Sequence, residues 1–153
     1  MNASSIVLLV AGILALQVLL WIPIIAWLRR RTRQRLDALA GELTGEAIVL
    51  GPQAAVYRGS SCGLPRVKGN GVMALTEARL VFVFLTGGRL ELPLSTLTGV
   101  RDDVWFLRSY HGGRPHVIAQ REDGEVGFIV TAHDDWMHAL RERVGAARPT
   151  SAP

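Results

Sequence analysis

The sequence begins with an apolar segment that restricts what the chain can be. Residues Ile6–Leu28 form a run of 23 residues without a charged side chain, and only Gln17 and Pro23 interrupt its apolar character. As a helix, this run would span about 34 Å, enough to cross a hydrocarbon layer of roughly 30 Å. The rest of the chain is too small to bury such a helix in a soluble core. We therefore predict a transmembrane helix over about residues 6–28.

A cleaved signal peptide is the alternative interpretation of this segment. Residues 1–5 carry no basic side chain, and the apolar run is longer than the apolar region of an ordinary signal peptide. Arginines follow the run at the place where a cleavage site would need small residues. These features favour a helix that stays in the mature protein.

A basic cluster directly follows the apolar run and predicts its orientation. The cluster consists of Arg29, Arg30, Arg31, Arg33 and Arg35. Because basic residues are retained on the cytoplasmic side, we expect the N-terminus outside and residues 29–153 on the cytoplasmic face of the inner (plasma) membrane. The same arginines have a second interpretation as contacts to anionic lipid headgroups, each worth about 1 kcal/mol near the surface. Their role in topology is sufficient to explain them.

Composition excludes several classes of protein. The formal charge is +4, from 17 basic and 13 acidic residues. Without the five clustered arginines, 12 basic residues face 13 acidic ones, so we expect no nucleic-acid partner. The single cysteine, Cys62, excludes a disulfide scaffold and a thiolate zinc finger built by this chain alone.

The part after the apolar run divides into three segments. Residues 29–45 have helix-forming composition with Leu36, Leu39 and Leu43 at helical spacing, which predicts a basic juxtamembrane helix or linker. Residues 46–147 are predicted to form one domain of about seven short strands and a final helix. Residues 148–153 are predicted to be a disordered tail.

Several strands can be located within this domain. The run Leu80–Leu85 is apolar on both faces, which predicts a central strand that is covered on each side. Gly87-Gly88 predicts a two-residue turn into a strand over Arg89–Leu94. A further strand is predicted over Val104–Leu107.

A hairpin and a helix complete the domain. Asp123-Gly124 predicts a hairpin turn in which Arg121 pairs with Val126. This register places five apolar side chains on one core-facing surface: Val117, Ala119, Val126, Phe128 and Val130. An amphipathic helix is predicted over Asp134–Val144, and its apolar stripe consists of Trp136, Met137, Leu140 and Val144.

These segments resemble those of pleckstrin-homology (PH)-like and GRAM domains. The resemblance covers about residues 46–144, and it is carried by GNGVMALTEARLVFVF (69–84), by RLELPLSTLTGV (89–100), and by the hairpin and tryptophan-bearing helix after them. With its single apolar helix, the chain resembles small membrane proteins common in actinobacteria. The resemblance implies a mainly β fold, in which a bent antiparallel barrel of about seven strands is capped by a C-terminal α-helix.

The resemblance also points to a candidate phosphate site. Family members that bind phosphoinositides carry a basic residue at the end of the first strand and a basic-x-basic pair in the second. Arg58 and the segment Arg66-Val67-Lys68 are similar to this pattern. Alternation along a strand would place Arg66 and Lys68 on one face. The alternative interpretation is three solvated charges beside a loop.

Potential catalytic and metal-binding residues form no recognisable signature. Cys62 could act as a nucleophile with His111 or His116 as its base, but no motif brings them together. His133 and His138 are five positions apart, about 140° around a helix, so they cannot chelate one metal from the same face. Asp102 and Asp103 add carboxylates but no metal-binding spacing. We expect no enzyme, no metal site and no cofactor.

Three functional hypotheses follow. The first is a single-pass membrane protein that presents a non-catalytic, PH-like binding or scaffolding module to a protein partner at the cytoplasmic face. The second is recognition of anionic lipid headgroups through Arg58, Arg66 and Lys68, aided by the arginines of segment 29–35. The third is an enzyme or a regulatory subunit of a membrane enzyme.

Overall fold

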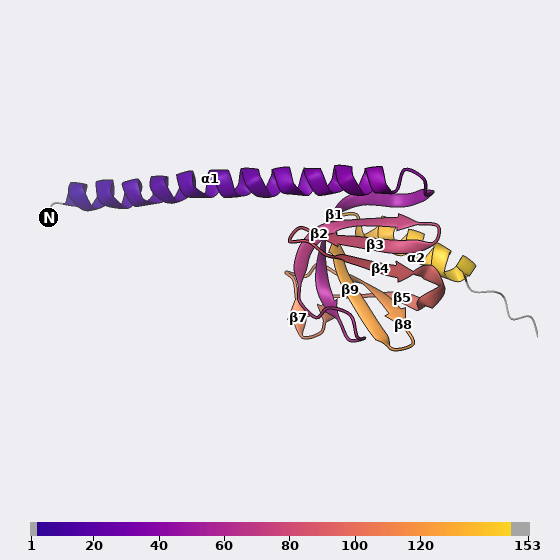
Figure 1. Cartoon of the computed structure of the whole chain (residues 1–153). Helices are drawn as coiled ribbons and strands as arrows, with labels where there is room; N and C mark the ends of the chain where they lie inside the picture. Colours follow the sequence, from indigo (N-terminus) through magenta and orange to yellow (C-terminus); the bar gives the residue numbers. More distant parts are fainter. Residues whose placement is uncertain (1–2, 148–153) are drawn as a thin grey trace, which may run out of the picture. The chain divides into compact units, whose positions relative to one another are not determined.

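The computed structural model describes residues 3–147, and the predicted disordered tail lies outside the described residues. The chain divides into two compact units, Met1–Gln34 and Arg35–Pro153. Figure 1 shows a long N-terminal helix, a bent sheet and a C-terminal helix. The elements in chain order are α1 (Ala3–Glu42), β1 (Ile48–Ser60), β2 (Gly69–Thr76), β3 (Arg79–Phe84), β4 (Arg89–Pro93), the short 3-10 helix η1 (Leu94–Thr96), β5 (Leu97–Asp103), β6 (Trp105–Phe106), β7 (Ser109–Tyr110), β8 (His116–Arg121), β9 (Gly124–Val130) and α2 (His133–Ala147).

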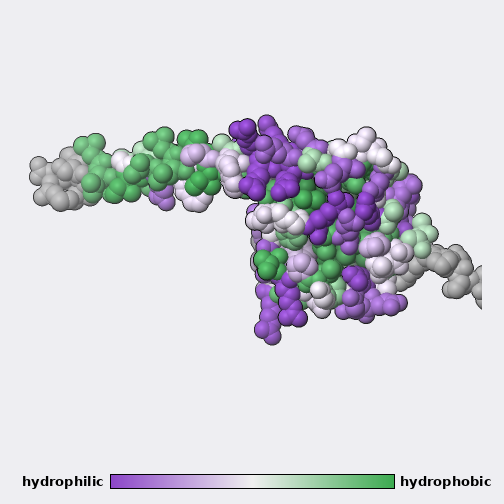
Figure 2. Space-filling model, in the orientation of Figure 1, coloured by the Kyte–Doolittle hydropathy of each residue, from purple (hydrophilic) through white to green (hydrophobic). Residues whose placement is uncertain are grey.

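The first unit is helical and contains the apolar run. Residues 7–28 of α1 are all exposed, and their surface is mostly hydrophobic in Figure 2. Judged by length and composition, this helix could cross a membrane. Pro23 lies inside the helix, and the Arg31 guanidinium lies 5.3 Å from the centroid of the Trp27 ring.

The second unit is built on one antiparallel sheet of seven strands. The strand order is β4-β3-β2-β1-β9-β8-β5, so two meanders are joined where β1 pairs with β9. The edge strands β4 and β5 do not pair with each other, and α2 contacts β5 and η1. The predicted mainly β fold with an N-terminal apolar helix and a C-terminal helix is confirmed. The sheet, however, stops short of a closed barrel.

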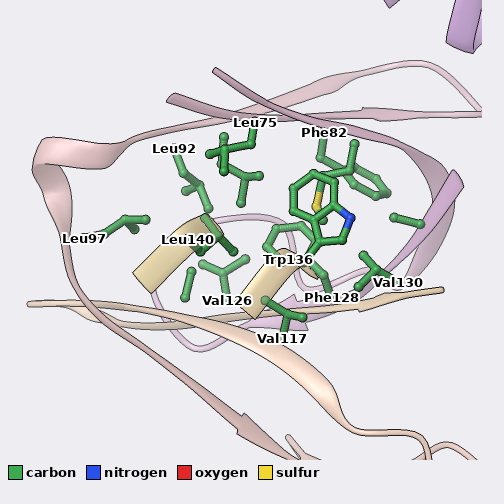
Figure 3. Packing of buried hydrophobic residues seen from close by; sticks show 14 of the residues in the cluster. Leu75, Phe82, Leu92, Leu97, Val117, Val126, Phe128, Val130, Trp136 and Leu140 are labelled. Carbon is green, nitrogen blue, oxygen red and sulfur yellow. The ribbon is translucent and has the colours of Figure 1, made fainter. Parts of the chain in front are cut away.

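The core lies between the bent sheet and α2. The predicted stripe of Trp136, Met137, Leu140 and Val144 is buried as expected. Figure 3 shows the Trp136 ring surrounded by side chains from several strands, among them Phe82, Phe128 and Val130. The apolar side chains of α2 therefore bury the inner face of the sheet.

A second apolar cluster explains why β3 is apolar on both faces. Leu80 and Phe82 of β3 point into the main core, whereas Val81 packs with Leu39 and Leu43 from the end of α1 and the turn after it. Both leucines are less than 2% exposed. The prediction of a strand covered on each side is thus confirmed. Its second cover comes from the segment predicted to be a linker, and the compact unit begins at Arg35, ahead of the predicted boundary at residue 46.

The hairpin of β8 and β9 has a different register from the predicted one. Arg121 pairs with Gly124, so the turn residues are Glu122 and Asp123, and the predicted pairing of Arg121 with Val126 is wrong. The error shifts the pairing by two residues. Because side chains alternate with a period of two, all five residues predicted to face the core still do so.

The predicted strand over 104–107 is part of a separate two-stranded ribbon. Strand β5 ends at Asp103, and β6 then pairs with β7, with Trp105 opposite Tyr110 and Phe106 opposite Ser109. We refer to residues 104–110 as the ribbon. It forms the first part of the connection between β5 and β8.

Candidate functional site

Three predicted basic residues converge on one pocket. Arg58 comes from β1, and Arg66 and Lys68 come from the loop between β1 and β2. The pocket has a volume of about 370 Å³ and is lined by Arg58, Ser60, Ser61, Arg66, Lys68 and Leu107. We call it the basic pocket. Arg66 and Lys68 lie in a loop because β2 begins at Gly69, so the expectation that strand alternation aligns them is wrong, although both line the pocket.

Arg58 is fixed by the ribbon. Its Nη2 donates a hydrogen bond to Oγ of Ser109, which is buried in β7. The Nε atom of Arg58 is also buried, and it has no hydrogen-bond partner among the described residues. Because this N–H is enclosed by the protein, it is not exposed at the surface of the pocket.

A bulge in β1 brings the pocket walls close together. The pairing of β1 with β9 is irregular between Tyr57 and Gly59, and Gly59 has a φ of 110°. A Cβ at this position would lie 3.3 Å from the Arg66 carbonyl oxygen and 3.5 Å from Cδ1 of Leu107. Glycine therefore permits both the backbone conformation and the close approach of the loop.

Tyr57 holds the loop that carries Arg66. Its hydroxyl donates a hydrogen bond of 2.5 Å to the carbonyl oxygen of Pro65, the residue before Arg66. Burial, together with the nearby Cys62, raises the pKa of Tyr57 to about 12. The neutral phenol is thus the form that the fold stabilises.

The serines of the pocket are also held by the backbone. The hydroxyl of Ser60 lies 2.6 Å from the carbonyl oxygen of Cys62 and 3.0 Å from its backbone N–H. The hydroxyl of Ser61 accepts a hydrogen bond of 2.8 Å from the backbone N–H of Glu125. These bonds tie the start of the loop to β9 as well as to itself.

The residues considered for nucleophilic catalysis are not assembled. Cys62 is 3% exposed, and within residues 3–147 its thiol contacts the Ser60 hydroxyl and the Glu125 carbonyl oxygen. His111 is exposed, whereas His116 is buried, with Nδ1 3.0 Å from the carbonyl oxygen of Asp103. Burial is the main reason that the pKa of His116 is lowered, and Arg58 acts in the same direction.

The candidate metal ligands do not gather either. In residues 3–147 there is no group of three or more histidine, cysteine, aspartate or glutamate side chains that could hold a metal ion. The side chains of Asp102 and Asp103 form ion pairs with Arg141 and Arg101, and His133 contacts Asp134.

Ion pairing distinguishes the pocket region from the rest of the second unit. Six arginines elsewhere in the described part of this unit each pair with a carboxylate: Arg79, Arg89, Arg101, Arg121, Arg141 and Arg143. Among the described residues, no ion pair is found for the five basic side chains around the pocket and ribbon, which are Arg58, Arg66, Lys68, Arg108 and Arg114. Segments 58–68 and 104–116 contain no acidic residue.

Two of these basic residues were not predicted. Arg108 and Arg114 are far from Arg58 in the sequence, and the ribbon brings its own segment beside the pocket through Leu107 and Ser109. The absence of acidic residues from segment 104–116 was the available signal. The predicted arginines Arg29, Arg30, Arg31 and Arg33 belong to the first unit, and Arg35 begins the second.

Comparisons with known proteins identify no family. No family model matches the chain, and no curated protein matches it. Among solved structures, it is similar to the C-terminal domain of an unknown protein from Leishmania infantum, at 10% identity and a TM-score of 0.46. That match covers 79% of this chain and 97% of the other. A similarity this weak supports no conclusion about function.

Proposed function

We propose that this protein is a single-pass membrane protein whose second unit is a non-catalytic, PH-like module that binds an anionic phosphate group at the cytoplasmic face. The observation that carries this proposal is the basic pocket, where Arg58, Arg66 and Lys68 converge without a carboxylate among the lining residues. Guanidinium and ammonium groups make strong, charge-assisted hydrogen bonds to phosphate.

The sequence and fold support the membrane and family parts of the proposal. The apolar part of α1 is long enough to span a bilayer, and the arginines after it favour a cytoplasmic second unit. Two antiparallel meanders joined through β1 and β9, with a C-terminal helix packed against the sheet, are compatible with a PH-like module. Such tethering raises the local concentration of the module at lipid headgroups. The protein partner predicted from the sequence remains a prediction.

Binding of a water-soluble headgroup tests the proposal. The full chain in a non-ionic detergent without phosphate is titrated with glycerol 1-phosphate and, separately, with inorganic phosphate. We expect saturable binding that weakens by about ten-fold or more in the double variant Arg66→Gln/Lys68→Gln, because two charge-assisted contacts are lost. A stronger response to glycerol 1-phosphate than to inorganic phosphate would favour a lipid headgroup as the source.

A matched variant controls for net charge. Arg141→Gln/Arg143→Gln removes the same charge from α2, where both arginines form exposed or half-exposed ion pairs. We expect this variant to bind as the wild type does. Equal weakening in both double variants, or no binding by the wild type, would contradict the proposal.

A further inference from the structure

We propose that an apolar tip beside the basic pocket inserts into the interfacial region of an anionic membrane. The apolar tip consists of Trp105, Leu107 and Tyr110 from the ribbon. This inference rests on the proposed function, because it names the surface of a lipid bilayer as the partner of the same region.

The apolar tip is unusually exposed for its residue types. Trp105 is 58% exposed, Tyr110 52% and Leu107 46%, whereas Trp136 in the core is fully buried. The Trp105 and Tyr110 rings lie together across the ribbon, with centroids 5.1 Å apart. Where Figure 1 labels β7, Figure 2 shows a hydrophobic patch next to projecting hydrophilic side chains. Exposed apolar clusters rimmed by polar residues mark interaction sites.

The ribbon itself is held in place, so this exposure is a property of the fold. Phe106 is buried, and a Cβ at Gly127 would collide with its ring. Ser109 accepts the hydrogen bond from Arg58, and the Asp103 carboxylate accepts a 2.9 Å hydrogen bond from the backbone N–H of Trp105. Inward-facing Phe106 and Ser109 thus alternate with outward-facing Trp105 and Tyr110, as the pleat of a strand requires.

The two turn residues of the ribbon have an unfavourable backbone conformation. Leu107 and Arg108 have φ angles of 45° and 59°, a region that residues other than glycine rarely adopt. Two-residue hairpins that need this conformation usually contain asparagine or glycine. A leucine and an arginine in their place put one apolar and one basic side chain at the end of the ribbon.

The charge around the apolar tip indicates an anionic bilayer as its occupant. Arg66, Lys68, Arg108 and Arg114 are exposed and have no ion pair among the described residues, and no acidic residue lies in segments 58–68 or 104–116. Tryptophan and tyrosine favour the interface between water and lipid, where one end of the ring is apolar and the other polar. Basic residues near the surface of a bilayer are attracted to its anionic lipids.

Depth-dependent fluorescence quenching tests the inference in the full chain. Trp21→Phe/Trp27→Phe removes both tryptophans of the first unit and leaves Trp105 and the buried Trp136 as emitters. The variant is reconstituted into vesicles of phosphatidylcholine with or without phosphatidylglycerol, and lipids brominated near the headgroup serve as quenchers. We expect quenching and a blue shift of Trp105 emission in vesicles that contain phosphatidylglycerol. Trp105→Phe in the same background should remove this signal.

Charge variants test whether basic residues near the apolar tip, rather than basic residues anywhere on the surface, are needed for the quenching. Arg108→Gln/Arg114→Gln should reduce the quenching in anionic vesicles while leaving glycerol 1-phosphate binding intact, whereas Arg141→Gln/Arg143→Gln should leave the quenching unchanged. Absence of Trp105 quenching in a chain that still binds glycerol 1-phosphate would overturn this inference and leave the proposed function standing. Loss of both would overturn both. A blue shift that depends on protein density and not on brominated lipid would overturn the inference in favour of a second copy of the chain.

Discussion

At the scale of single residues, the basic pocket depends on side chains that do not line it. Tyr57 is fully buried in the core, yet its hydroxyl holds the backbone directly before Arg66. His116 lies under the ribbon, with its ring centroid 6.2 Å from that of Phe106, and it contributes to the electrostatic environment shared with Arg58. The backbone directly before Arg66 is therefore held from within the core.

Removing the Tyr57 hydroxyl should weaken both the fold and the pocket. We expect Tyr57→Phe to lower the free energy of unfolding by about 1 kcal/mol, the usual net contribution of one hydrogen bond. Glycerol 1-phosphate binding should weaken as well, because the loop that carries Arg66 is less restrained. Denaturant unfolding and titration measure the two effects. Unchanged binding in a variant that unfolds more easily would show that the bond does not position the loop.

The same residue predicts a loss of stability at alkaline pH. The pKa of Tyr57 in the fold, about 12, is above the ordinary value of 10, so the fold favours the protonated phenol. This stabilisation is fully present below pH 10 and is lost as the pH rises towards and through 12. Tyr57→Phe should show a smaller decrease in the unfolding midpoint between pH 10 and 12 than the wild type does.

His116 predicts an opposite dependence at acidic pH. Its pKa in the fold is below the ordinary 6.5, mainly because of burial, so the unfolded chain binds the proton more readily. The contribution of the neutral ring is complete above pH 6.5 and is lost as the pH falls through the folded-state pKa. The thermal midpoint of wild type should therefore fall more steeply below pH 6.5 than that of His116→Gln. Measurement of both proteins at pH 8 gives the stability lost with the hydrogen bond to Asp103, separately from the effect of protonation. Thermal midpoints that fall in parallel below pH 6.5 would contradict the assignment of the pH dependence to His116.

The candidate site was predictable only in part at this scale. Family resemblance identified Arg58, Arg66 and Lys68, and the structure brings all three to one pocket. The contacts that hold them are between residues far apart in the sequence, such as Arg58 with Ser109. Such contacts follow from the tertiary arrangement of the ribbon and have no local sequence signal.

At the scale of elements, the end of α1 belongs to the folded unit. Leu39 and Leu43 cover the outer face of β2 and β3, and Glu42 forms an ion pair of 2.6 Å with Arg89 of β4. The sequence showed the leucines at helical spacing and showed that β3 needs two covers. The sequence alone could not show that these leucines cover β3, because hydrophobic periodicity identifies an apolar face without identifying its partner.

Truncation of Leu39 tests this docking. We expect Leu39→Ala to lower the free energy of unfolding of the second unit by about 2–4 kcal/mol, because it opens a cavity against Val72, Ala74 and Val81. The control is Leu19→Ala in the exposed apolar part of the same helix, which should leave that unfolding unchanged. Equal stability of the two variants would mean that the helix end does not pack on the sheet.

The β8–β9 hairpin shows which aspects of strand pairing the sequence can predict. Its core-facing residues were identified because the alternation of apolar side chains has a period of two, and a shift by two residues preserves it. The turn was misplaced because Glu122-Asp123 lacks the asparagine-glycine or aspartate-glycine pattern, and Gly124 instead begins β9. The ribbon was missed as a pair because each of its strands is two residues long.

At the scale of the whole molecule, the sequence predicted the division between an apolar helix and a mainly β domain closed by a tryptophan-bearing helix. Both follow from long-range patterns of hydrophobicity that are strong enough to override local uncertainty. The proposed role depends on this division. The pocket and the apolar tip act on lipid only if α1 remains in the bilayer and keeps the second unit at its cytoplasmic surface.

Labelling from outside the cell tests this requirement most directly. Cys62 is buried and would report poorly, so the reporter is Glu122→Cys in a Cys62→Ala background, at an exposed turn position. We expect a membrane-impermeant maleimide to label the membrane-bound protein only after the cells are permeabilised, and the mass of the mature chain to include residues 6–28. Labelling of intact cells, or a mature chain that lacks residues 6–28, would contradict the account.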